Sequence, residues 1–468
     1  MIPKSAPPGT AQAAAAPTHA SLEEVHGSVA VPHHSAPVLR KLRAFIGPAI
    51  LVSVGYMDPG NWGTDLAGGA QFKFGLLWVV AMASFMAVIL QLCAARLGIV
   101  TGKDLAQCCR DHLPGWSRWP NWIAMEIAIA ATDLAESVGS AVALNLLFGI
   151  PLTWGILITA LDVLALLALQ GLGIRLMEAI VAVFAGTIGV CYFLELFVLP
   201  ATHPDFAAMG HAMLRPSLAQ PGMAVLAIGI IGATVMPHNL FLHSALVQTR
   251  KVTRDEPSVR SAIRFNTIDC VVALSLAFLV NAAILVLAAT VFHGRETMVV
   301  GTEVITFAPD TDWIRVAHLT LAPLLGTAAA STLFAVALLA SGQSSTITGT
   351  LAGQVVMEGF MRWRIRPWVR RMISRTLAII PAIWLVSIRG TRSVTDLVNL
   401  SQVLLCLVLP LALFPLMYFT SRSDLMGKYK AGRVLIGLGW VSTVLITCMA
   451  LYSLPESLRV AWQIIQGN

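Results

Sequence analysis

The stretch Asp58-Pro59-Gly60-Asn61 decides the fold of this 468-residue chain. It interrupts an apolar run, residues 45–70, that is long enough to cross a lipid bilayer. A carboxylate, a proline, a glycine and a carboxamide are costly at membrane depth, where ionisable groups usually mark the path of a substrate or an ion. Backbone that leaves the helix is tolerated there only where it is buried in protein or lines a cavity. The tetrapeptide therefore predicts a polar site inside a membrane protein.

The composition indicates the same class of protein. Hydrophobic residues make up 57% of the chain and charged residues 12%, against about 25% charged residues in soluble domains. The seven cysteines are scattered without a CxxC motif, which is typical of small buried apolar residues. We predict an all-α membrane protein with eleven spans: 45–70, 75–99, 122–148, 152–170, 176–199, 223–247, 267–291, 317–342, 373–388, 396–419 and 433–453.

The distribution of Lys and Arg predicts the orientation. Residues 1–42 are rich in Pro, Ala, Ser and His without apolar periodicity, and we expect a disordered cytoplasmic tail. With the tail inside, 24 of the 31 Lys and Arg residues fall on the cytoplasmic side. The odd number of spans then places the C-terminus outside. The net charge of +7 follows from topology and requires no nucleic-acid partner.

A second interruption lies in the sixth span, at Gly232-Ala233-Thr234-Val235-Met236-Pro237-His238-Asn239. Each break lies in the first span of a five-span block, and because five is odd the second block enters the membrane from the opposite face. Such inverted repeats supply a binding site from their broken first helices near the bilayer midplane. We therefore divide the chain into the tail, a first repeat over 43–200, a second repeat over 201–420, and an eleventh span with a short extracytoplasmic C-terminus over 421–468.

The two breaks offer a mixed set of metal ligands. Asp58 and Asn61 present oxygens, Met236 presents a thioether sulfur, and unwound backbone near Gly55 and Ala233 presents carbonyl oxygens. One negative charge among them suits a cation. Oxygen ligands alone suit Mg²⁺ or Ca²⁺, whereas added sulfur favours a transition metal. The alternative is that Met236 is a packing residue, as most methionines are.

At these residues the chain resembles the Nramp family of divalent-metal transporters, near its bacterial manganese-importing branch, from about residue 40 to the end. The family motifs are matched by both breaks and by Ala131-Thr132-Asp133-Leu134-Ala135-Glu136, Gly349-Thr350-Leu351-Ala352-Gly353-Gln354 and Ser401-Gln402-Val403-Leu404-Leu405. The chain departs from the family at Trp62-Gly63, where Phe-Ala is more usual, and at Asp162 in the fourth span.

The resemblance implies a LeuT-like fold with helices 1 and 6 broken. It implies that a monomer in the bacterial inner membrane imports Mn²⁺ or Fe²⁺ with protons by alternating access, with Cd²⁺, Co²⁺ and Zn²⁺ as further candidate substrates. Neither an enzymatic activity nor a resident cofactor is implied. The implied metal ligands are Asp58, Asn61, Met236, the Ala233 carbonyl and, in some states, Gln402.

The third span carries three carboxylates, Glu126, Asp133 and Glu136, at spacings that place neighbours on one helix face. Three such groups in a membrane helix predict a proton relay. The resemblance links them to proton transfer together with Asp58, His238, Arg370 and Arg371. The alternatives are a purely structural ion-pair network, arginines that only enforce topology, and a histidine that only packs.

Other functions fit the residues less well. A symporter of the same fold could carry Mg²⁺ or an organic solute such as an amino acid, but Met236 disfavours Mg²⁺ and Asp58 would repel a carboxylate. A membrane enzyme is disfavoured because the sequence contains no HExxH or GxSG motif. Broken helices in inverted repeats favour alternating access over a channel.

Overall fold

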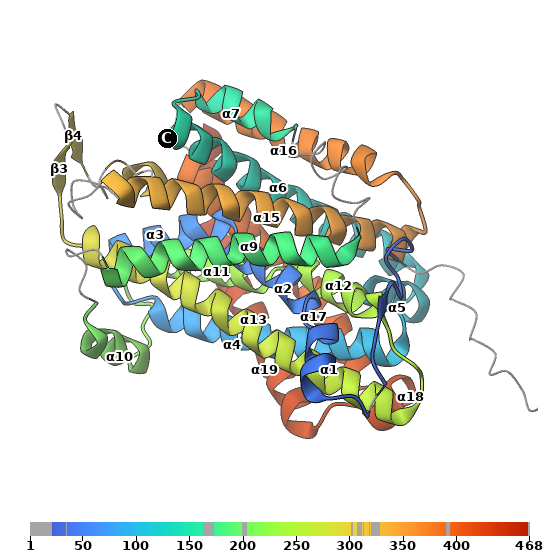
Figure 1. Cartoon of the computed structure of the whole chain (residues 1–468). Helices are drawn as coiled ribbons and strands as arrows, with labels where there is room; N and C mark the ends of the chain where they lie inside the picture. The colour runs from blue at the N-terminus through green and yellow to red at the C-terminus, as the bar shows by residue number, and fades with distance from the viewer. Residues whose placement is uncertain are drawn as a thin grey trace, which may run out of the picture.

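The computed structural model describes residues 21–33, 35–161, 173–198, 204–300, 303–306, 311, 313–317, 319, 328–389 and 394–466, and these form an almost entirely helical bundle (Figure 1). The first half contains β1 (Val29–Ala30), α1 (Val38–Phe45), α2 (Pro48–Ser53), η1 (Val54–Met57), α3 (Pro59–Phe72), α4 (Leu77–Thr101), α5 (Leu105–His112), η2 (Gly115–Ser117), α6 (Arg118–Phe148), α7 (Leu152–Thr159), α9 (Ile174–Phe193), η3 (Leu194–Val198) and α10 (Phe206–Leu214). The second half contains α11 (Met223–Val235), α12 (Pro237–Leu246), η4 (Val247–Thr249), β2 (Arg250–Lys251), α13 (Glu256–Val291), β3 (Thr297–Val300), β4 (Glu303–Thr306), α15 (Ala328–Met361), α16 (Pro367–Arg389), α17 (Val394–Ser421), α18 (Ser423–Met426), η6 (Gly427–Tyr429) and α19 (Arg433–Gln466).

Within the described residues, eight helices are long and apolar enough to cross a membrane. Three of the eleven predicted spans are not among the eight. The first is divided into α2, η1 and α3, the fourth is described only as far as residue 161, and the ninth, α16, begins with an arginine-rich turn. Asp162 therefore lies outside the described residues.

The breaks in helices 1 and 6 follow from local sequence. Pro59 begins α3 and Pro237 begins α12, each at the first helical position, where the missing N–H of proline costs nothing. Asp58 is extended, with φ −69° and ψ 166°. Met236 has φ +38°, a left-handed backbone that a non-glycine residue rarely adopts. Both predicted interruptions are therefore present where the sequence placed them.

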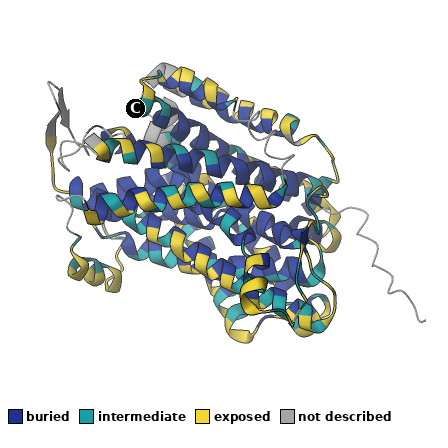
Figure 2. Cartoon of the chain, viewed as in Figure 1, coloured by how far each residue is buried: buried dark blue, intermediate teal, exposed yellow. Residues whose placement is uncertain are grey.

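The broken helices lie in the centre of the bundle. Helix α3 packs against α11 and α13, α11 packs against α17, and α6 packs against α15, α16 and α17. Figure 2 shows the buried residues gathered inside the bundle and the exposed residues on its outward faces. Large apolar side chains such as Phe85, Trp154 and Leu276 are exposed on outward helix faces, as expected for surfaces that contact lipid, and the two breaks are buried away from these faces.

The structure corrects two predictions. The disordered tail is wrong for residues 21–33 and 35–42: β1 pairs with β2 in parallel, the Leu22 N–H donates to Glu358 (3.0 Å), and Glu23 pairs with Arg364 (2.9 Å). This segment is ordered by contacts with distant parts of the chain, which composition does not reveal. The span predicted over 317–342 is also misplaced, because α15 continues to Met361 and contains the glycine-rich motif at 349–354.

Candidate metal site and ion-pair network

The first break is organised around Asp58. Its side chain caps α3 by accepting a hydrogen bond from the Asn61 N–H (2.9 Å). The carbonyl oxygens released by the unwound turn are used by other helices: Ser341 Oγ donates to the Met57 carbonyl (2.5 Å) and Asn281 Nδ2 to the Tyr56 carbonyl (2.8 Å). The non-helical backbone is therefore held by α15 and α13.

The Asn61 side chain joins the first break to the second. In the amide orientation that satisfies its neighbours, its nitrogen donates to Asp58 Oδ1 (2.8 Å) and to the Ala233 carbonyl (3.3 Å). Its oxygen accepts from Asn281 Nδ2 (3.0 Å). Three of the predicted ligands, from α3 and α11, thus lie within hydrogen-bonding distance of one another.

Met236 and Gly55 are connected through Asn239. Asn239 Nδ2 donates to the Met236 sulfur (3.4 Å), and a Cβ atom at Gly55 would lie 2.3 Å from that same nitrogen. Glycine is therefore required at Gly55 for the two breaks to approach each other.

Gln402 of α17 lies against both breaks. A Cβ atom at Gly60 would lie 2.2 Å from Gln402 Nε2, and one at Gly232 would lie 2.0 Å from the Gln402 carbonyl oxygen. The absence of a side chain at Gly60 and at Gly232 therefore leaves the space that Gln402 occupies. All six predicted metal-site residues (Gly55, Asp58, Asn61, Ala233, Met236 and Gln402) are buried in one region.

Several polar atoms at the breaks have no hydrogen-bond partner among the residues that the structure describes. They are Asp58 Oδ2, His238 Nδ1, Asn239 Oδ1 and Gln402 Oε1. Buried polar atoms are normally hydrogen-bonded, so their clustering marks a place for a polar ligand. No group of three or more His, Cys, Asp or Glu side chains that could hold a metal ion occurs in the described residues, so a metal at the breaks would need amide, carbonyl or thioether ligands beside Asp58.

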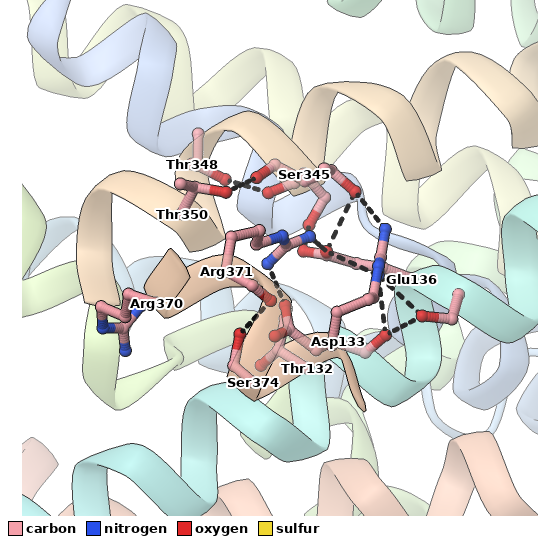
Figure 3. Close-up of polar contacts among 12 residues, drawn as sticks. Thr132, Asp133, Glu136, Ser345, Thr348, Thr350, Arg370, Arg371 and Ser374 are labelled. Carbon is pink, nitrogen blue, oxygen red and sulfur yellow. Dashed lines mark hydrogen bonds and ion pairs between the residues drawn. The ribbon is translucent and has the colours of Figure 1, made fainter. Parts of the chain in front are cut away.

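A second buried polar cluster joins α6, α15 and α16 (Figure 3). Arg371 pairs with Asp133 and also with Glu136 (3.0 Å), and Arg375 lies 3.7 Å from Glu136. Ser345 Oγ donates to Glu136 (2.6 Å). We call the four charged residues the ion-pair network.

The glycine-rich motif of α15 makes room for Glu136 of the network and for Arg370. A Cβ atom at Gly349 would lie 3.2 Å from Glu136 Oε1, and one at Gly353 would lie 1.6 Å from Arg370 Nη1. A side chain at Gly353 would therefore displace Arg370.

The two arginines of the predicted proton pathway contact different carboxylates. Arg370 does not join Arg371 but pairs with Glu126 (2.7 Å), a partly exposed residue two turns away on α6. The residue that accompanies Arg371 is Arg375, which sequence reasoning missed. Its spacing of four residues from Arg371 was the available signal, because residues i and i+4 share a helix face.

The two polar clusters lie on helices that touch. Helix α6 packs against α3 and α12, and a Cβ atom at Gly139 of α6 would lie 2.3 Å from Pro59 Cβ at the first break. His238 is buried on α12 directly after the second break. The predicted proton-pathway residues Asp58, His238, Asp133 and Glu136 are thus brought together, whereas Glu126 and Arg370 form a separate pair nearer the surface.

Three further polar groups at the breaks were not predicted as site residues. Gln91 of α4 donates to the Tyr56 hydroxyl (2.7 Å), and its Oε1 lies 2.9 Å from His243 Nδ1, which ties α4 to both broken helices. Asn281 was also missed. Asp65, buried on α3 with neither carboxylate oxygen hydrogen-bonded within the described part of the chain, extends the polar lining beyond Asn61.

Comparisons with known proteins agree with this geometry. The family model described as natural resistance-associated macrophage protein-like matches residues 49–456. The chain is 48% identical to the divalent metal cation transporter MntH of Nostoc sp., over 94% of this chain and 96% of that one. It is 47% identical to MntH of Mesorhizobium japonicum, over 94% of each.

Solved structures agree as well. The Eremococcus coleocola manganese transporter matches with a TM-score of 0.82 at 37% identity, over 94% of this chain and 91% of that one. Mhp1, a nucleobase-cation-symport-1 family transporter, matches with a TM-score of 0.56 at 15% identity, over 90% and 93%, which shows the fold alone.

The fold and the paired breaks define a multi-pass membrane protein with the LeuT-like architecture, in which two inverted five-helix repeats are followed by an eleventh helix. Within that class, the chain belongs to the Nramp family.

Proposed function

We propose that this protein imports divalent transition-metal ions, Mn²⁺ or Fe²⁺, together with protons. The observation that carries the proposal is the buried carboxylate Asp58, with one oxygen unpartnered among the described residues, beside an amide, a backbone carbonyl and a thioether. The relatives' names, divalent metal cation transporter and manganese transporter, support the same substrate class.

In the proposed site, Asp58 neutralises part of the ion's charge. When the Asn61 amide turns so that its oxygen, and not its nitrogen, faces Asp58, Asn61 and the Ala233 carbonyl add oxygen ligands. Met236 adds sulfur, and Gln402 and the Gly55 carbonyl complete the set in some states. Because Ca²⁺ and Mg²⁺ bind thioether sulfur poorly, Met236 favours transition metals over these abundant ions. Unwound backbone at both breaks allows the half-helices to tilt, which opens the site to one side and then the other.

Protons follow a path that begins at the same carboxylate. We propose that Asp58 and His238 exchange protons and that Asp133 and Glu136 pass them on between α6 and α16. Arg370 and Glu126 lie at the exposed end of this path. Arg371 and Arg375 pair with the two inner carboxylates and hold them between α6 and α16.

The protein acts in the bacterial inner membrane as a monomer, with the N-terminus in the cytoplasm and the C-terminus outside. The excess of Lys and Arg on the N-terminal side supports this orientation. No enzymatic activity and no resident cofactor are proposed. A symporter of the same fold for Mg²⁺ or an organic solute is not favoured, because the relatives' names give divalent metal cations or manganese as the substrate.

Purified full-length protein in proteoliposomes tests substrate and coupling together. We expect Mn²⁺ to enter liposomes that contain a metal-sensitive dye, and to enter faster when the outside is made acidic. Mg²⁺ at the same concentration should not compete. Mn²⁺ entry at the same rate with and without the imposed pH gradient would refute the coupling to protons. Competition by Mg²⁺ at the same concentration would refute the selectivity for transition metals.

A further inference from the structure

A cavity of about 460 Å³ opens between α4, the beginning of α13 and η6, at the end of the bundle that we place in the cytoplasm. Five cationic side chains line it: Arg96, Arg260, Arg264, Lys428 and Lys430. They come from three segments that are distant in sequence, so the fold gathers them. This cationic pocket is remote from the broken helices.

The charge of the cationic pocket is only partly compensated. One carboxylate, Glu256, pairs with both Arg260 (2.6 Å) and Lys428. Within the described chain the other three have no ion pair: Arg96 donates to the Tyr429 carbonyl (3.3 Å), Lys430 donates to Ser423 Oγ (3.2 Å), and Arg264 is exposed. An anion therefore meets excess positive charge there.

The cationic pocket continues into an apolar recess. A smaller cavity of about 90 Å³ shares Arg96, Ile263 and Thr267 with it and is lined further by Asn266 and by three apolar residues, Leu92, Ile99 and Leu435. A free inorganic anion gains nothing from contact with apolar side chains. An anion attached to a hydrocarbon chain matches both parts.

The position along α13 matches the membrane surface. This helix has 36 residues and is about 54 Å long at 1.5 Å per residue, well beyond the roughly 30 Å of hydrocarbon. The part of α13 that exceeds the hydrocarbon thickness is its charged N-terminal end. Arg260 and Arg264 therefore lie at the level of the lipid headgroups. Basic pockets between membrane helices on the cytoplasmic side commonly bind anionic headgroups.

We propose that the cationic pocket binds the phosphate of an anionic phospholipid from the adjacent leaflet, with one acyl chain in the apolar recess. The leaflet rests on the proposed orientation, whereas the binding itself does not depend on metal transport. The headgroup would link α4, α13 and the α17–α19 connection at one end of the bundle.

Binding to the full-length protein in a neutral detergent tests the proposal. The probes are dioctanoyl phosphatidylglycerol, dioctanoyl phosphatidylcholine, glycerophosphoglycerol (the same headgroup without chains) and inorganic phosphate, each titrated calorimetrically. We expect the phosphatidylglycerol to bind at least about 10-fold more tightly than the other three, since each nearby Lys or Arg contributes roughly fivefold. Inorganic phosphate or glycerophosphoglycerol binding as tightly would overturn the lipid assignment, and so would equal binding of phosphatidylcholine.

Variants locate the binding. Arg264→Gln with Lys430→Gln should weaken phosphatidylglycerol binding about 10-fold or more. The matched control is Arg362→Gln with Arg366→Gln, two exposed arginines near the end of α15 outside the pocket, and it should leave binding within about twofold. Equal losses of phosphatidylglycerol binding in the two double variants would show that the lipid is attracted by the general surface charge, and would refute binding in the pocket. Should the double variant fail to fold, Lys430→Gln alone, expected to weaken binding roughly fivefold, makes the same distinction.

Discussion

The broken-helix site and the ion-pair network are both buried, polar and centred on carboxylates, but they differ in how those carboxylates are satisfied. Asp133 and Glu136 each contact a guanidinium group, and Glu136 accepts further hydrogen bonds from Ser345 and Thr346. Asp58 contacts no cationic side chain in the described structure, and one of its oxygens has no partner there.

The difference separates two uses of buried charge. A buried carboxylate without a cation is costly, so it persists where a cationic ligand arrives to pair with it. A carboxylate paired with arginine already has its cation and has no need of a metal. We therefore assign metal binding to the broken-helix site and restrict the network to protons and structure.

Of the variants considered, Asp58→Asn should have the largest effect, because it acts on the broken-helix site. It removes the one charged side chain among the proposed metal ligands, and one charge–charge contact at 4 Å is worth about 4 kcal/mol at an effective dielectric constant of 20. We expect Mn²⁺ uptake by proteoliposomes and calorimetric Mn²⁺ binding to fall by at least about 100-fold.

The matched control for Asp58→Asn is Asp269→Asn on α13. Asp269 is also buried, but it accepts hydrogen bonds from the Gly47 N–H (3.3 Å) and the Ala49 N–H (2.9 Å). Its loss should alter stability and leave Mn²⁺ affinity within a few-fold. Equal losses of Mn²⁺ binding in the two variants would mean that any buried carboxylate matters, and the site assignment would fail.

Arg371→Gln tests the paired cluster. Removing one partner of a buried ion pair leaves an uncompensated charge and typically costs 3–5 kcal/mol. We expect a loss of roughly that size in the free energy of unfolding in detergent. Adding Asp133→Asn to Arg371→Gln should restore much of the stability, because Glu136 and Arg375 then remain as an oppositely charged pair. A single variant as stable as wild type would show that the network contributes nothing to the fold.

Met236→Ala tests the role of the thioether sulfur within the metal site. Loss of the sulfur leaves the oxygen ligands, which Ca²⁺ prefers. We expect Mn²⁺ transport to persist within several-fold while Ca²⁺ competes about 10-fold better. Met57→Ala is the control, since Met57 is buried at the other break and its carbonyl, not its sulfur, is engaged by Ser341. Unchanged exclusion of Ca²⁺ in Met236→Ala would disprove the role of the sulfur.

Local sequence was enough to predict both breaks, because Pro59 and Pro237 cannot donate a helical hydrogen bond and each stands beside a polar or soft ligand. The partners of the ion-pair network were only partly predictable. Consecutive helical residues point about 100° apart, so Arg370 and Arg371 could not both face the same carboxylates, and Arg375 became the second partner.

Contacts between distant segments could not be predicted from the sequence. Nothing near residue 29 indicates that it pairs with Arg250, and nothing near Gln91 indicates that it meets Tyr56 and His243. Such pairings are fixed by how whole helices pack, so they depend on the complete fold and not on any local pattern.

Asp104, at the beginning of α5, extends the comparison to a buried carboxylate outside the membrane spans. It caps α5 by accepting from the Gln107 N–H (2.9 Å), and Gln107 Oε1 accepts from the Asp104 N–H (3.1 Å) in return. Burial raises the pKa of Asp104 from 3.8 to about 6. One oxygen of Asp104 is thus hydrogen-bonded, whereas Oδ2 is buried without a hydrogen-bond partner among the described residues.

The pH dependence of stability follows from the sign of that shift. The folded state binds the Asp104 proton more tightly than the unfolded chain, so the stabilisation is fully present below about pH 4 and is lost as the pH rises through about 6. Between pH 5 and pH 7 the loss should be on the order of 1 kcal/mol in unfolding free energy. Asp104→Asn keeps a good N-cap but has no proton to lose, so its unfolding free energy should lack this part of the slope. The same slope in both proteins would place the titrating group elsewhere, and a steeper slope in the variant would mean that the ionised carboxylate stabilises the cap.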